Sequence, residues 1–104
     1  MQKRKPLDVY IKLWKQSKRV LLAICDENIL GKTLKHGNVV FHVREDFYKG
    51  SLVSLQEALD LIEKSTVVNM VGQRIVKEAV EKGLVHPDAV LKINGVPHAQ
   101  IVKF

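Results

Sequence analysis

The sequence predicts an α+β fold, in which an antiparallel sheet of about five strands carries two helices packed on one face. Three observations lead to this prediction. Residues 8–14 alternate apolar and polar side chains, as a strand with one buried face does. Residues 55–64 and 66–83 repeat apolar side chains at helical spacing. Asn94-Gly95 between two apolar runs indicates a tight hairpin. With the segments between them, the predicted order is ββ-loop-β-α-α-ββ.

Length and composition indicate one domain. The chain has 104 residues, of which 46% are hydrophobic, and a chain of this size can bury its own core. We predict a single α+β domain over residues 7–104, preceded by a flexible basic tail over residues 1–6. The single cysteine, Cys25, excludes an internal disulfide and a multi-cysteine zinc site. No apolar run approaches the roughly 18 residues of a membrane span. These features predict a cytoplasmic protein that does not enter a membrane.

The first ordered region is predicted to be a hairpin. One face of residues 8–14 is apolar and the other is aromatic and basic, with Val9, Ile11 and Leu13 against Tyr10, Lys12 and Trp14. Residues 19–25 are apolar at nearly every position, which favours a central strand covered on both faces. Residues 16–18 are expected to form the turn between them.

The middle of the chain is predicted to be less regular. Residues 26–38 are expected to form an irregular loop with bends at Gly31 and Gly37. Residues 39–44 alternate and predict a strand with Val39, Phe41 and Val43 facing inward. Residues 45–50 are expected to be a loop anchored by two aromatic side chains, Phe47 and Tyr48.

Two helices are predicted to follow. Ser54 and Glu57 have the spacing of a capping box and start a short amphipathic helix over residues 55–64. Residues 66–83 predict a longer central helix, capped by Ser65 or Thr66 and ended by Gly83. Gly72 lies in the middle of its apolar face, so we expect a neighbouring element to pack closely there.

The C-terminal hairpin is predicted in detail. A two-residue turn at Asn94-Gly95 pairs Ile93 with Val96 and Leu91 with His98. Pro97 has no N–H to donate to a neighbouring strand, which predicts that its strand lies at a sheet edge or is bulged there.

The basic residues are concentrated in one part of the chain. Residues 1–36 carry nine Lys or Arg against three Asp or Glu, and this difference accounts for the whole formal net charge of +6. Such a distribution favours a polyanionic partner, although a solvated basic surface explains it as well. Aromatic side chains lie among the cations, as in surfaces that bind unpaired RNA. The candidate RNA-binding residues are Lys3, Arg4, Lys5, Tyr10, Lys12, Trp14, Lys15, Lys18, Arg19, Lys32 and Lys35.

A second hypothesis is a small ligand-binding protein or enzyme with a cleft near Asn69, Gly72, His98 and Gln100. His98 and Gln100 share one strand face, and a histidine can act as a general base. His98 has no partner at a recognisable spacing, so no catalytic residues are assigned. The four histidines are scattered without metal-ligand spacing, and we predict neither a metal nor a cofactor. A third hypothesis is a protein-interaction adaptor, for which Met70 on the polar side of the helix is the sequence signal.

Several short motifs together resemble a known family. They are Leu30-Gly31-Lys32-Thr33, Glu45-Asp46-Phe47-Tyr48, Asn69-Met70-Val71-Gly72 and Gly95-Val96-Pro97-His98-Ala99-Gln100. The chain resembles, from Val9 to Val102, an archaeal family of small conserved proteins catalogued as domain of unknown function 424. The resemblance implies an archaeal, single-domain, cytosolic protein and transfers no catalytic residue. An archaeal protein of this kind most often meets RNA in translation, so the leading hypothesis is a non-enzymatic RNA-binding protein associated with ribosomal RNA or a ribosomal subunit.

Overall fold

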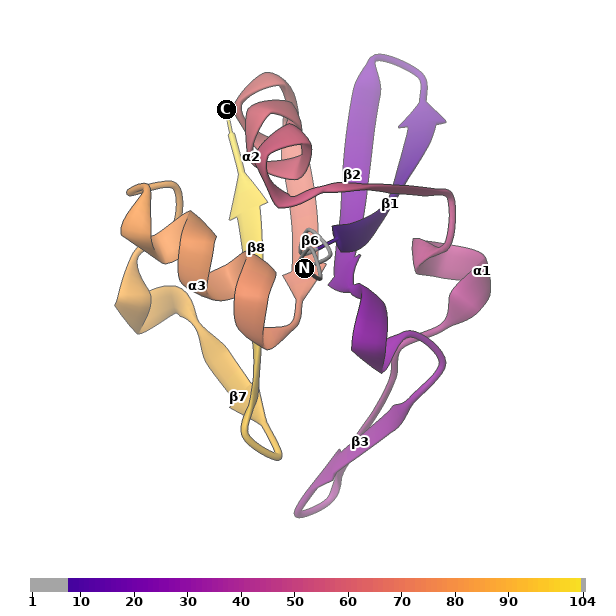
Figure 1. The fold of residues 1–104 in the computed structure, drawn as a ribbon, viewed down its shortest axis with the longest axis vertical. Helices are drawn as coiled ribbons and strands as arrows, with labels where there is room; N and C mark the ends of the chain where they lie inside the picture. The colour runs from indigo at the N-terminus through magenta and orange to yellow at the C-terminus, as the bar shows by residue number, and fades with distance from the viewer. Residues whose placement is uncertain (1–7, 104) are drawn as a thin grey trace, which may run out of the picture.

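The computed structural model describes residues 8–103 (Figure 1). The predicted tail over residues 1–6, with Lys3, Arg4 and Lys5, lies outside these residues. In chain order the elements are β1 (Asp8–Gln16), β2 (Arg19–Asp26), the 3₁₀ helix η1 (Glu27–Ile29), β3 (Thr33–His36), β4 (Val39–His42), α1 (Glu45–Tyr48), β5 (Ser51–Ser54), α2 (Leu55–Lys64), β6 (Val67–Val71), α3 (Gln73–Glu81), the 3₁₀ helix η2 (Pro87–Ala89), β7 (Leu91–Ile93) and β8 (Val96–Val102).

The α+β class is confirmed, but the number and order of strands differ from the prediction. A six-stranded sheet has the order β5-β1-β2-β6-β8-β7, and β3 and β4 form a separate two-stranded sheet. The sheet is mixed, because β2 and β6 are parallel while the other paired strands are antiparallel. The parallel pair is possible because the chain crosses from β2 to β6 through a long connection that includes α2.

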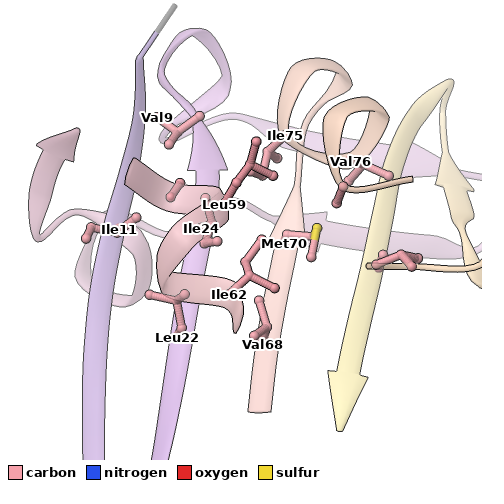
Figure 2. Packing of buried hydrophobic residues seen from close by; sticks show 14 residues of the cluster. Val9, Ile11, Leu22, Ile24, Leu59, Ile62, Val68, Met70, Ile75 and Val76 are labelled. Atoms are coloured by element: carbon pink, nitrogen blue, oxygen red, sulfur yellow. The ribbon is translucent and has the colours of Figure 1, made fainter. Parts of the chain in front are cut away.

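The main core lies between the large sheet and the two longer helices, α2 and α3. Leu22 and Ile24 from β2, and Val68 and Met70 from β6, point to the same sheet face because side chains alternate along each strand. Figure 2 shows these side chains packed against Leu59 and Ile62 of α2 and Ile75 and Val76 of α3. The prediction that two helices pack on one face is therefore confirmed for α2 and α3.

The predicted helix over residues 66–83 is wrong in its first third. Residues Val67–Val71 form a strand, and the helix runs only from Gln73 to Glu81. Apolar residues buried on both faces of a strand also fit a helical wheel, and this explains the error. Gly72 is the joint between strand and helix, with φ of 131° and ψ of 150°, a conformation essentially restricted to glycine. Met70 is therefore a core residue with 0% exposure, not a polar-side residue of a helix.

The N-terminus of α3 is capped by a side chain from another strand. Asp26, at the end of β2, is 2% exposed, and its carboxylate accepts hydrogen bonds from the backbone N–H groups of Arg74 at 2.8 Å and Ile75 at 3.1 Å. A Cβ at Gly72 would lie 2.4 Å from Asp26 Cγ. The close neighbour that we predicted at Gly72 exists, but it is this carboxylate. Burial raises the pKa of Asp26, although the two backbone hydrogen bonds act in the opposite direction.

The two residues predicted to cap the central helix have other partners. Ser65 closes the end of α2 and donates its hydroxyl to Leu61 O at 2.8 Å. Thr66 donates its hydroxyl to Val20 O at 3.2 Å. The other helix signals are confirmed: Ser54 accepts from the Glu57 N–H at 3.1 Å, and Gly83, with φ of 74°, follows the end of α3.

The irregular middle contains more structure than predicted. Residues 33–36 pair with β4 as β3, residues 51–54 pair with β1 as β5, and residues 45–48 form the short helix α1. Four-residue elements contain too few repeats for a periodic pattern, which is why the sequence did not reveal them. Val39 is 53% exposed, so its predicted inward orientation is wrong, whereas Val43 is fully buried.

Both predicted hairpins are confirmed. Trp14 pairs with Leu21 in the first, and Ile93 pairs with Val96 and Leu91 with His98 in the last. Pro97 does not lie on an edge strand, because β8 is between β6 and β7. The β6 ladder ends at the pair of Val71 with His98, so Pro97 lies beyond its last residue and its missing N–H breaks no bond of that ladder.

Candidate functional site

The sheet face opposite α2 and α3 is covered over only part of its area. Ala23, Cys25 and Val71 on this face pack into a second cluster with Val43 and Tyr48, which come from the segment that includes β4 and α1. Among residues 8–103, no helix or strand covers the rest of the face. We call this uncovered part the open face. It contains a hollow of about 320 Å³, and the residues that line this first hollow define the open face: Trp14, Gln16, Arg19, Leu21, Val67, Asn69, Gln100 and Val102.

A second hollow, of about 340 Å³, adjoins the first where the open face meets the covering segment. Asn69 and Gln100 line both hollows, and they are paired across β6 and β8. The second hollow is lined by Phe41, His42, Arg44, Phe47, Tyr48, Asn69, His98 and Gln100. The side-chain amides of Asn69 and Gln100 therefore lie between two neighbouring hollows. Each hollow also has an aromatic residue and an arginine in its lining.

Trp14 is the fixed aromatic group of the first hollow. Its indole Nε1–H donates to Phe47 O at 3.1 Å, and its ring stacks on Phe47 with centroids 5.7 Å apart and an interplanar angle of 21°. Lys12 Nζ lies 4.6 Å from the Trp14 ring centroid and donates to Asp46 O at 2.8 Å. Trp14 is still 38% exposed, so an anchored ring and a cation are presented together at the edge of the sheet.

Arg44 is the exposed cation of the second hollow. Its guanidinium donates two hydrogen bonds to the Asp46 carboxylate, from Nε at 3.0 Å and from Nη2 at 2.6 Å. This guanidinium holds the pKa of Asp46 below its usual value. The pair fixes the direction of Arg44 while leaving both side chains solvated, so its remaining N–H groups are free to donate to an anion.

Asn69 is a polar side chain whose hydrogen-bonding capacity is incompletely used. Among the described residues, its Oδ1 is a buried side-chain oxygen without a hydrogen-bond partner. A buried polar atom without a partner costs about 1–3 kcal/mol. The neighbouring Gln100 side chain is exposed and makes no hydrogen bond to it. A bound molecule that carries both hydrogen-bond donors and acceptors would form the hydrogen bonds that the Asn69 side chain lacks.

His98 lies against an aromatic ring rather than a catalytic partner. The ring centroids of His98 and Phe41 are 5.2 Å apart at an interplanar angle of 71°. Burial lowers the pKa of His98, which favours the neutral ring. Cys25, on the same face, is fully buried, and burial raises the pKa of its thiol to about 12. That thiol is therefore protonated at neutral pH and is a poor nucleophile.

The structure divides the predicted RNA-binding residues among several places. Lys12, Trp14 and Arg19 share the side of the open face, because side chains alternate along β1 and β2. Lys15 points to the opposite side by the same alternation, and Lys18 lies in the turn. Tyr10 is half-buried against the second cluster.

Two of the predicted cations within residues 8–103 are remote from the first hairpin. Lys35 lies on β3 and Lys32 just before it, and Figure 1 shows the β3 hairpin and the β1–β2 turn at opposite ends of the molecule. Of the alternative cleft, Asn69, His98 and Gln100 come together in the second hollow. Gly72 does not join them, because it lies against Asp26 on the helix side of the sheet.

Several residues of the site were missed by sequence reasoning. Arg44, Phe41 and Phe47 line the second hollow and were interpreted as parts of an ordinary strand and loop. They reach the site through folding of the segment between β2 and β5 over the sheet, a long-range contact that leaves no local periodic signal. The one available signal was the cluster of aromatic and charged residues at 44–48.

Two structural features are absent from residues 8–103. This part of the chain holds no group of three His, Cys, Asp or Glu side chains arranged to bind a metal ion. None of its helices has the length and apolar character to cross a membrane.

Comparisons with known proteins give a family and a structural relative. A family model described as "Protein of unknown function (DUF424)" matches residues 15–104, which confirms the resemblance read from the motifs. No curated protein matches the sequence. The crystal structure of an uncharacterized conserved protein from Methanopyrus kandleri is similar, with a TM-score of 0.79 and 28% sequence identity over 93% of this chain and 94% of that chain.

Proposed function

The chain belongs to the DUF424 family of proteins of unknown function, and we propose that it is a non-enzymatic RNA-binding protein. We further propose that it acts in the cytoplasm of an archaeon and associates with ribosomal RNA or a ribosomal subunit. The similar protein from Methanopyrus kandleri supports the archaeal source. The basic character of residues 1–36 supports a polyanionic partner.

One observation carries the proposal: the open face and the second hollow that adjoins it combine the three kinds of group that bind unpaired RNA. Aromatic side chains at Trp14 and Phe41 offer stacking surfaces for bases. The amides of Asn69 and Gln100 can donate to and accept from base edges. Arg19 and Arg44 can donate to phosphates. Trp14, Arg19, Asn69 and Gln100 lie on strands of the large sheet, as in other sheets that bind single strands, and Phe41 and Arg44 come from the segment that packs against it.

The alternation of side chains along the first hairpin supplies a matched test. Arg19 and Arg44 line the hollows, whereas Lys15 is an exposed cation of the same hairpin on the opposite side. We expect the double variant Arg19→Glu with Arg44→Glu to bind RNA weakly, and Lys15→Glu to bind nearly as wild type does. If each arginine contacts one phosphate, the slope of log K against log salt should fall by about 0.7 per contact.

Filter binding of ribosomal RNA and of a single-stranded oligonucleotide, each over a salt series, measures both quantities. Equal affinities for wild type and the double variant, or an equal loss in Lys15→Glu, would contradict RNA binding at the open face.

Association with the ribosome has its own test. At low salt, wild type should co-sediment with a ribosomal subunit from a lysate, and the double variant should remain in the supernatant.

A second candidate function is a small ligand-binding protein or enzyme, and one observation favours it. Asn69, His98 and Gln100, predicted as a possible cleft, do line one hollow. In that case a metabolite screen by thermal shift should find a ligand that stabilises the wild type and not His98→Ala. The RNA proposal predicts no such ligand, and instead predicts that His98→Ala melts earlier because it loses the contact with Phe41.

A further inference from the structure

A groove of about 620 Å³ lies on the other side of the molecule from the open face. It runs between α3 and the segment that contains η2 and β7, which lie side by side in Figure 1. The hairpin of β7 and β8 contributes Lys92 and Pro97 to the lining of the groove, and these two residues are paired across the strands. The next pair, Leu91 with His98, faces the opposite side, because neighbouring residues alternate along a strand. The groove and the open face are therefore separate surfaces.

The floor of this groove is aliphatic. Its exposed or half-buried aliphatic residues are Val80 of α3, Pro87 of η2 and Val90, whereas Val76 and Pro97 also line it but are themselves buried. No aromatic side chain lines it, so it offers no platform on which a nucleobase could stack. Branched and aliphatic side chains of a polypeptide fit such a surface better than a base does, because their burial needs no polar partner.

The rim of the groove is mainly basic. Arg74, Lys77 and Lys92 are exposed cations of the lining, and Glu81 is its single carboxylate. Within residues 8–103, no carboxylate lies within salt-bridge distance of Arg74, Lys77 or Lys92, so the three rim cations are not paired in the structure. An aliphatic floor inside a cationic rim is complementary to a segment that combines aliphatic and acidic residues.

We propose that this groove binds an acidic segment of a partner protein. The segment places aliphatic side chains on Val80, Pro87 and Val90, and its carboxylates meet Lys77, Lys92 and Arg74 at the rim. This site is independent of the proposed RNA site, because the two share no residue. The protein would then join an acidic protein to a nucleic acid through opposite faces of one sheet.

Selection of peptides from a random phage library on the immobilised wild-type protein tests the proposal. The expected peptides contain at least two Asp or Glu near two or more aliphatic residues. A labelled synthetic peptide of the selected sequence is then titrated by fluorescence anisotropy. Reversal of two rim charges in Lys77→Glu with Lys92→Glu should weaken its binding by about tenfold or more.

The matched control is Lys82→Glu, an exposed lysine at the end of α3 that does not line the groove, and it should bind the peptide as wild type does. Backbone amide shifts on peptide addition should lie in α3 and in residues 87–97. Three outcomes would overturn the proposal: no enriched peptides, enriched peptides that are basic or uncharged, or equal affinity of the rim variant and the control. Peptide displacement by a single-stranded oligonucleotide would also overturn it, since the groove would then belong to the RNA surface.

Discussion

Replacement of Gly72 by alanine tests the junction between β6 and α3. An added Cβ would lie 2.4 Å from Asp26 Cγ and 2.7 Å from each of its carboxylate oxygens. The backbone φ of 131° at this position adds a second penalty for any residue with a side chain. The carboxylate cannot move away freely, because it holds the N–H groups of Arg74 and Ile75 at the start of α3.

The expected loss of stability is the sum of these effects. Backbone strain at such a position costs about 1–3 kcal/mol. Displacement of a charged acceptor from a buried N–H costs roughly 1.5–3 kcal/mol for each hydrogen bond lost. If one of the two hydrogen bonds to Asp26 is lost, Gly72→Ala should reduce the free energy of unfolding by about 2.5–6 kcal/mol. This is a large part of the total for a small domain, which is about 5–15 kcal/mol.

Gly83→Ala is the matched control for urea denaturation. Gly83 also has a positive φ, of 74°, but nothing lies within 4 Å of a Cβ built there. It should therefore show only backbone strain, of about 1–2 kcal/mol. Equal losses in the two variants would refute the reasoning, because the contact with Asp26 would then contribute nothing. A melt of Gly72→Ala that is unchanged from wild type would refute it as well.

Three further predictions concern pH and binding. Burial raises the pKa of Asp26, so the folded state binds a proton at this carboxyl more tightly than the unfolded state does. Wild type should therefore lose stability relative to Asp26→Asn as the pH rises above about 3.8. The same dependence of unfolding free energy on pH in both proteins, measured by urea denaturation, would contradict the shift. Because burial lowers the pKa of His98, wild type should lose stability relative to His98→Gln as the pH falls below 6.5; the opposite slope would show a charged ring in the fold. Trp14→Ala should reduce RNA affinity while leaving the salt slope unchanged, because stacking releases no counterions; a changed slope in filter binding would show that the variant disturbs nearby Lys12.

Local signals in the sequence were sufficient for the hairpins, the Ser54 cap and α2. Each is determined by residues within a few positions of one another, such as Asn94-Gly95 or Ser54 and Glu57. The segment around Gly72 shows where local signals fail. Valines are buried on both faces of β6, so the sequence there shows no alternation of apolar and polar side chains that would indicate a strand. The need for glycine at position 72 follows from its contact with Asp26, which is distant in the sequence.

The candidate site was predictable only in part for the same reason. Asn69, His98 and Gln100 were identified as polar groups that stand out from apolar surroundings, and strand pairing brings them together. The basic half of residues 1–36 was identified as well, but alternation and turns distribute its cations over different surfaces. Arg44 and Phe47 required the tertiary contact between α1 and the edge of the sheet, which a periodic pattern does not encode.

Strand β8 connects the two proposed surfaces, because alternate residues of one strand serve each of them. Pro97 faces the groove, while His98 and Gln100 face the hollows on the other side. A slip of one residue in the pairing of β8 would exchange these side chains between the two faces. The register is fixed by the turn at Asn94 and Gly95, whose φ values of 52° and 81° are those of a type I′ turn. The Asn-Gly pair therefore determines which side chains reach the hollows and which reach the groove, although it belongs to neither.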